Sequence, residues 1–178
     1  SPSFEGTLTM TDALYTASIP VFKQMLQALS GVLHKAEEHA TAKKIDPNAL
    51  LQTRLYPDMF PLLRQVMIAT DFAKGACARL AGVDVPVMPD TELTFAELQT
   101  RIATVVTFIS GLDATLFDQP HSREIVIQAG TPRERRFDAS TYLLHYGLPQ
   151  FFFHVTTAYA LLRHNGVEVG KKDYMGAK

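Results

Sequence analysis

Two residues of this chain have the chemistry and the placement to bind a metal ion: His154 and Asp71. On a helical projection His154 falls about 70° from an apolar stripe, at its edge. A polar ring at such an edge needs a hydrogen-bond partner or a cavity. His154 is therefore either a hydrogen-bonded histidine of a core or interface, or a neutral nitrogen ligand.

Asp71 lies on the face of its predicted helix that is opposite a stripe of alanines. One interpretation is an ion pair with Lys74, three residues further on. The other makes Asp71 an oxygen ligand, or a group that orients a neighbouring histidine. His154 and Asp71 are thus the candidate metal residues, and whether they face one cavity decides between the alternatives.

A ligand pocket is expected around His145, His154 and Tyr159. His145 lies nine residues before His154 and would point the opposite way on a straight helix. A kink at Gly147 and Pro149 is needed to bring the two rings together.

The other candidates have simpler interpretations. His34 and Glu38 lie one turn apart in a charged helix end, which favours a solvated surface. Cys77 is expected to be a small buried apolar residue. No nucleotide-binding glycine loop, serine elbow, His-Glu-x-x-His or Cys-x-x-Cys motif is present. A basic cluster favours protection of a strand edge over a grip on phosphate or carboxylate, and it comprises Arg133, Arg135 and Arg136.

Composition excludes several classes of protein. The 178 residues include 17 Lys+Arg and 18 Asp+Glu, so a formal net charge of −1 argues against binding to nucleic acid or to a membrane surface. The single cysteine indicates a reducing compartment, and we expect a cytoplasmic protein. Residues 1–10 lack the pattern of a signal peptide, and the richest apolar segment, residues 148–162, is too short and too polar to span a membrane.

The elements that must position these side chains are helices. Apolar residues recur in steps of three and four, which predicts amphipathic helices. The first begins near Tyr15 after a cap at Thr11 or Asp12, and Asp46-Pro47 starts a short helix. The long helices are predicted over residues 15–44, 57–80, 95–112 and 149–164.

The helix boundaries carry their own signals. Gly82 can end the second long helix in a left-handed conformation. Thr94 and Glu97 have capping-box spacing before the third. Residues 124–128 and 133–137 read as a β-hairpin, and residues 140–146 as a helical lead-in to the fourth helix.

These elements predict an all-α fold: a four-helix bundle with a small β-hairpin insertion between the third and fourth long helices. We expect one domain over residues 1–178, with residues 1–10 loosely ordered. The fourth helix is apolar almost all round, which favours a homodimer.

Several sequence segments resemble those of an uncharacterised bacterial domain-of-unknown-function family of the DinB/YfiT-like metalloenzyme superfamily. They are KKIDP (43–47), LYPDMFPL (55–62), AKG (73–75), ARLAG (78–82) and HVTTAYALLRHNG (154–166). The resemblance implies a DinB-like bundle. It also implies a divalent metal held by one histidine of the second helix and two histidines, one turn apart, of the last.

This sequence departs from that pattern. Residues 57–82 contain no histidine, and His154 and His164 are ten residues apart, which separates them by about 15 Å and about 80°. The sequence identifies no cofactor. The alternative is a divalent metal ion, zinc or nickel, bound by His154 and Asp71.

We therefore expect an uncharacterised DinB-like protein that is cytoplasmic and dimeric, with a small-ligand pocket near His154 and no catalytic constellation. The alternatives are a metal-dependent enzyme of hydrolase or thiol-transferase type with a non-standard site, and a structural dimer without a pocket. The enzyme alternative is supported only by analogy with the superfamily.

Overall fold

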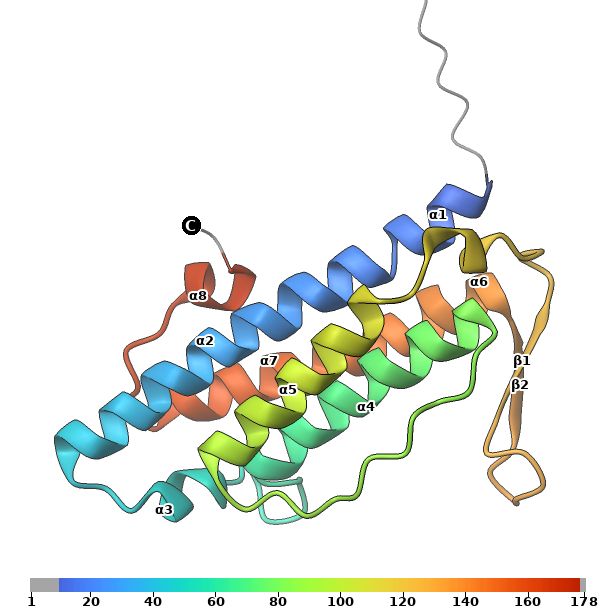
Figure 1. Cartoon of the computed structure of the whole chain (residues 1–178). Coiled ribbons are helices and arrows are strands. Elements are labelled where there is room, and N and C mark those ends of the chain that lie inside the picture. The colour runs from blue at the N-terminus through green and yellow to red at the C-terminus, as the bar shows by residue number, and fades with distance from the viewer. Residues whose placement is uncertain (1–9, 177–178) are drawn as a thin grey trace, which may run out of the picture.

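Four long helices lie side by side in the computed structural model, which describes residues 10–176 and, for side chains, residues 13–176. Helix α4 contacts both α5 and α7, and α2 contacts the same two helices from the other side (Figure 1). Their bounds are α2 (Ile19–Lys43), α4 (Leu62–Ala81), α5 (Phe95–Ser110) and α7 (Leu148–His164). The mostly helical fold with a small hairpin is confirmed.

The predicted stripes form the core. On α2 and α4 the stripe residues are almost completely buried, and they include Phe22, Leu26, Leu29, Leu33, Val66, Ala69, Ala73 and Ala76. The alanines allow a close approach: a Cβ placed on Gly147 would lie 3.6 Å from Cβ of Ala76. Small side chains on α4 therefore set how closely the last helical segment packs on it.

The first long helix is interrupted, and its prediction as one helix from Tyr15 was wrong. Helix α1 (Met10–Thr16) ends before α2 begins at Ile19. Ser18 donates its hydroxyl to the carbonyl oxygens of Leu14 at 2.5 Å and Tyr15 at 3.2 Å, and Pro20 has no N–H to continue the ladder. The predicted caps, Thr11 and Asp12, lie outside the described side chains.

The boundaries of the next helices follow their cap residues. Asp46 accepts a hydrogen bond from the backbone N–H of Asn48 and starts the short helix α3 (Pro47–Leu51). Helix α4 begins at Leu62 rather than near residue 57, and Gly82 ends it with φ of 73°. The capping box of Thr94 is confirmed, because the side chain of Glu97 in turn accepts the backbone N–H of Thr94.

A short 3₁₀ helix, η1 (Ala114–Phe117), follows α5 and leads to the hairpin. Strands β1 (Glu124–Ile127) and β2 (Arg135–Asp138) pair antiparallel, with Val126 opposite Arg136. Figure 1 shows the hairpin at the end of the molecule where α4 finishes and the last helical segment begins.

The last helical segment contains a π-helical stretch where the sequence predicts a kinked lead-in. Helix α6 (Ala139–Thr141) runs into the π-helical segment η2 (Tyr142–Gly147) and then into α7. Pro149 has no N–H to offer the α-helical ladder, which accounts for the altered pattern one turn earlier. The rings of Tyr142 and Tyr146 stack here, with centroids 5.9 Å apart.

A short helix, α8 (Lys171–Met175), lies against α2 (Figure 1) and reaches α7 through Tyr174. Asp173 pairs with Lys35 of α2 at 2.6 Å, and Tyr174 packs edge-on against Tyr159 of α7. Some of the surface that suggested a partner subunit is thus covered by the chain itself. Among residues 10–176, no helix has the length and apolar character needed to cross a membrane.

Candidate functional site

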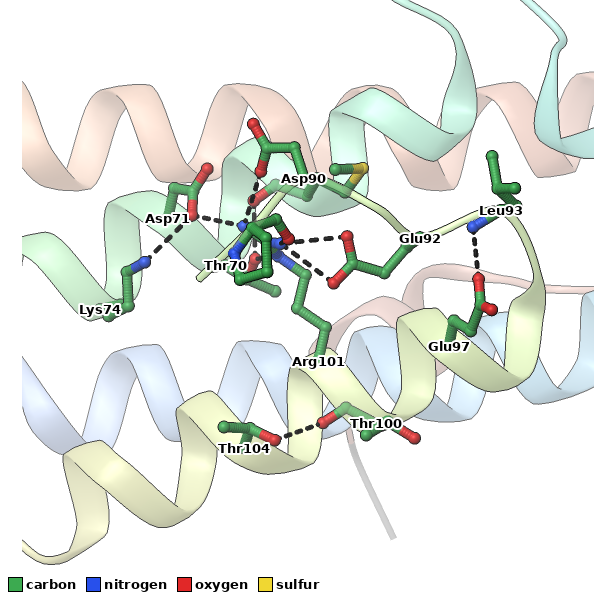
Figure 2. A network of polar contacts seen from close by, with 12 residues as sticks. Thr70, Asp71, Lys74, Asp90, Glu92, Leu93, Glu97, Thr100, Arg101 and Thr104 are labelled. Atoms are coloured by element: carbon green, nitrogen blue, oxygen red, sulfur yellow. Dashed lines mark hydrogen bonds and ion pairs between the residues drawn. The ribbon is translucent and has the colours of Figure 1, made fainter. Parts of the chain in front are cut away.

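Asp71, the predicted carboxylate ligand, belongs to a cluster of charged groups between α4, α5 and the loop that connects them. Its Oδ1 lies 2.6 Å from Nη2 of Arg101 and 3.5 Å from Nζ of Lys74 (Figure 2). The ion pair with Lys74 is therefore present, but Arg101 is the closer partner. No hydrogen bond or ion pair joins Asp71 to His154.

Arg101 is a fully buried guanidinium, and each of its three nitrogens donates a hydrogen bond. Nε donates to the hydroxyl of Thr70 at 2.7 Å, and Nη1 donates to both carboxylate oxygens of Glu92 at 3.1 Å. Asp90 lies 3.3 Å from Nη2. Burial lowers the pKa of Arg101, but the charge of Asp71 and the hydrogen bonds of Glu92 outweigh it and raise the pKa. The group stays charged and ties the α4–α5 loop to the two helices.

His154 shares a hydrogen bond with Gln65 of α4, whose Oε1 lies 2.7 Å from Nδ1. The amide nitrogen of Gln65 donates to the carbonyl of Phe60 at 3.1 Å, so its amide oxygen faces the ring and assigns the imidazole proton to Nδ1. The ring stacks on Phe72, with centroids 5.8 Å apart. His154 is 8% exposed, and burial lowers its pKa from the ordinary value of 6.5.

The lowered pKa of His154 predicts a pH dependence of stability. The unfolded chain binds a proton at this ring near pH 6.5, whereas the folded chain binds it only at lower pH. The contribution of His154 to the free energy of unfolding is therefore complete above pH 6.5 and declines as the pH falls through that value. Urea unfolding of the wild type and of His154→Gln between pH 5 and pH 8 measures this difference. A stability difference that stays constant over this range would contradict the assignment.

The two other predicted pocket residues lie elsewhere. His145 is exposed on the π-helical segment, and its charge contributes to a lowered pKa of Asp138, whose main cause is a hydrogen bond from the backbone of Thr141. Tyr159 packs against Tyr174 of α8. The described contacts do not bring His145, His154 and Tyr159 together.

A cavity of about 250 Å³ lies where α4, strand β1 and the π-helical segment meet. Its polar lining comes from Asp71, Arg79 and Gln128, and its apolar lining from Phe72, Ile127 and Tyr146. His154 packs against the ring of Phe72, one of the walls. Asp71 is therefore a lining residue, whereas His154 supports the wall.

Gln128 holds an unusual backbone conformation at the edge of this cavity. Its φ is 50°, in the left-handed region, which costs a non-glycine residue about 1–2 kcal/mol. Such conformations persist where the surrounding structure fixes them, and they cluster at ligand sites. The hairpin thus places a polar amide against the cavity at an energetic cost.

Cys77 and the pair His34–Glu38 match their simpler interpretations. Cys77 is completely buried, and burial raises the pKa of its thiol far above the usual range, so it is not an activated nucleophile. Nε2 of His34 lies 3.3 Å from Oε1 of Glu38, and both side chains are exposed on α2.

Comparison with known proteins places these residues in a family. The sequence model of a domain of unknown function, DUF1993, matches residues 14–175. The chain belongs to the DUF1993 family. A crystal structure of a DinB family member protein from Shewanella denitrificans has a TM-score of 0.87 to this DUF1993 chain, with 41% identity over 94% of each. A search of curated proteins finds no match.

The metal that the superfamily resemblance implies does not fit the donors of this DUF1993 protein. Among the side chains described for residues 13–176 there is no group of three or more His, Cys, Asp or Glu that could hold an ion. The residue of α4 that meets His154 is Gln65, a neutral amide and not the histidine that the resemblance implies. Asp71 is engaged by Arg101 and Lys74. The described donors therefore support no metal-dependent step.

Arg101, Gln65 and Arg79 are residues that the sequence interpretation did not single out. Arg101 directly precedes Ile102 of the predicted apolar stripe, and a charged residue at a stripe edge is a signal for a buried ion pair. Gln65 directly precedes Val66 of the α4 stripe in the same way. For Arg79 the available signal is a glycine one turn earlier, in the middle of a helix.

Proposed function

We propose that this DUF1993 protein is a small-molecule-binding protein whose ligand occupies the cavity between α4, β1 and the π-helical segment. The observation that carries the proposal is the lining: two adjoining rings, Phe72 and Tyr146, and a few charged or amide residues around the same space. Ligand sites typically combine apolar walls with a small number of placed polar groups. No catalytic constellation accompanies them among the described residues.

The size of the cavity favours a ligand built on one ring. At about 250 Å³ it is smaller than the sites of drug-sized molecules, which start at about 300 Å³. Two flat side chains line it, Phe72 and Tyr146, which meet edge-on with ring centroids 5.8 Å apart. A planar ring can pack against this pair with offset or edge-on geometry.

The elements behind the lining are rigid, which supports a preformed site. Arg101 fixes Asp71 from one side, and His154 holds Phe72 through ring stacking while Gln65 fixes the imidazole. Side chains whose own rotamers are held by such contacts bind with less loss of freedom.

The finer predictions from sequence belong to the same proposal. We propose that the four long helices form a DinB-like four-helix bundle and that the protein is a cytoplasmic homodimer. The ring of Phe153, which is 54% exposed on α7, supports the homodimer, since it is large apolar surface on the helix that suggested a partner.

The proposal predicts saturable binding of single-ring molecules. Titration with 3-fluorophenol and 3-fluoro-4-hydroxybenzoate, followed by fluorine NMR, should show saturation by at least one of them. Gln128→Phe, which fills the cavity, should weaken that binding by about 10-fold or more, because losing access to the apolar walls removes more than 1.4 kcal/mol.

Ala129→Phe is the matched control, because Ala129 is the exposed neighbour of Gln128 on the same turn and is not part of the lining. It should leave binding unchanged. Binding that is absent for both probes, or that survives in Gln128→Phe, would overturn the proposed function.

A further inference from the structure

The cavity contains a cation without a partner charge. Arg79 donates from Nη1 to the hydroxyl of Tyr142 at 3.1 Å, and no ion pair links it to any residue of the described chain. A guanidinium has five N–H donors. None of the remaining donors is a buried nitrogen without a partner, so they are open to the cavity or to water.

Tyr142 leaves this charge uncompensated. Burial raises the pKa of the Tyr142 phenol, although the neighbouring Arg79 acts in the opposite direction. The phenol is therefore neutral at physiological pH and accepts the hydrogen bond without neutralising the cation.

Capping of the C-terminal end of α4 does not explain where the guanidinium of Arg79 lies. Arg79 is in the last turn, where a positive charge favours the helix dipole. The terminal carbonyls, however, are bonded by Arg123, whose Nη2 lies 2.7 Å from the carbonyl oxygen of Arg79 and 2.9 Å from that of Leu80. The guanidinium of Arg79 instead runs back toward the preceding turn.

Gly75 makes room for that conformation. A Cβ at Gly75 would lie 2.6 Å from Nη1 of Arg79, well inside contact distance. A glycine within a helix costs about 1 kcal/mol relative to alanine. Here the glycine lets the guanidinium lie over the preceding turn of α4, beside Tyr142 and at the cavity wall.

The opposite side of the cavity offers an acceptor with little net charge. Both ion pairs of Asp71 use Oδ1, and Oδ2 has no hydrogen bond or ion pair with a described residue. Lys74 and Arg101 compensate the charge of the carboxylate. Oδ2 can therefore accept a hydrogen bond from a hydroxyl or amine of a ligand without repelling an anion strongly.

We propose that the ligand is a planar monocarboxylate that carries a hydrogen-bond donor, with its carboxylate on the open N–H groups of Arg79 and its donor on Oδ2 of Asp71. The planar fork of arginine matches the geometry of a carboxylate. One unpaired cation in the lining compensates one negative charge. This inference rests on the proposed function and names its ligand class.

Two probes that differ in one charge test the ligand class. In fluorine NMR titrations at pH 7, 3-fluoro-4-hydroxybenzoate should bind the wild type about 10-fold or more tighter than 3-fluoro-4-hydroxybenzamide, because hydrogen bonds between charged groups are the strong ones. Arg79→Gln should abolish this preference, because it weakens binding of the carboxylate far more than binding of the amide.

Gly75→Ala provides a second variant that keeps the charge of Arg79. The added methyl group displaces only the flexible end of the arginine, so the chain should fold normally, which a thermal melt verifies. Its preference for the carboxylate should fall by about 5-fold or more. Gly31→Ala in α2, where a Cβ would meet nothing within 4 Å, is the matched control and should retain the full preference.

The outcomes separate the two proposals. If the wild type binds both probes equally, or if Arg79→Gln keeps the preference, the carboxylate assignment is overturned while the ligand site stands. If the wild type binds neither probe, nor 3-fluorophenol, the proposed function fails and the assignment fails with it. A preference that is lost in Arg79→Gln and in Gly75→Ala, and kept in Gly31→Ala, supports the assignment.

Discussion

Replacing Arg101 with methionine should lower the free energy of unfolding by about 3 kcal/mol, measured by urea denaturation. The change removes a fully buried cation and leaves Asp71 and Glu92 without the group that offsets their charges. Breaking a buried pair by removing one partner costs about 3–5 kcal/mol. We expect the lower end, because Asp71 remains 40% exposed and water can solvate it.

Arg136→Met is the matched control for this prediction. Arg136 also pairs with two carboxylates, those of Glu124 and Glu134, but all of these groups lie at the surface of the hairpin. Exposed ion pairs contribute about 0–1 kcal/mol. If Arg101→Met destabilised the protein no more than Arg136→Met, the α4–α5 loop would not depend on the buried network of Figure 2.

Phe151→Ala should lower the free energy of unfolding by about 3–5 kcal/mol, the range for a large aromatic side chain removed from a core. Phe151 is completely buried and packs edge-on against Phe22 of α2, with ring centroids 4.8 Å apart. The loss combines the transfer of the ring to water, the cavity left behind and the aromatic pair itself. Thermal or urea unfolding measures it.

The neighbouring Phe153→Ala removes the same side chain from an exposed position on the same helix. It should change the free energy of unfolding by less than about 0.5 kcal/mol in the monomeric chain. The contrast between these two substitutions tests which face of α7 is buried. Comparable losses for both would show that Phe153 is also covered in solution, as the expected homodimer requires.

The helical stripes were predictable because their period is a local property of the sequence. The steps of three and four from Phe22 to Ala36, and from Val66 to Leu80, put every stripe residue in the core. Caps such as Thr94 and Gly82 were predictable for the same reason, since their partners lie within four residues.

The predicted helix boundaries were wrong where a local interaction interrupted a helix although the apolar stripe continued. At Ser18 the side-chain hydrogen bonds and the missing donor of Pro20 interrupt the helix, although the apolar period continues through them. The π-helical segment that precedes Pro149 has a similar origin, because a missing N–H changes the ladder without changing the pattern of residues.

The site was only partly predictable, because its contacts join distant residues. Asp71 was recognisable as a candidate, but its nearer partner, Arg101, is 30 residues away, and the partner of His154 is 89 residues away. The hairpin adds Gln128 to the cavity from a third part of the chain. Gly75 leaves room for the guanidinium of Arg79, and this role can be recognised only once the conformation of Arg79 is known.

The most direct test of the proposed ligand site is to locate where a carboxylate ligand binds. Amide chemical shifts of isotopically labelled protein, recorded while 3-fluoro-4-hydroxybenzoate is added, report the location residue by residue. Binding in the proposed cavity should give saturable shifts at four lining residues: Phe72, Arg79, Gln128 and Tyr146. Shifts confined to other surfaces, such as the groove between α2 and α8, would contradict it.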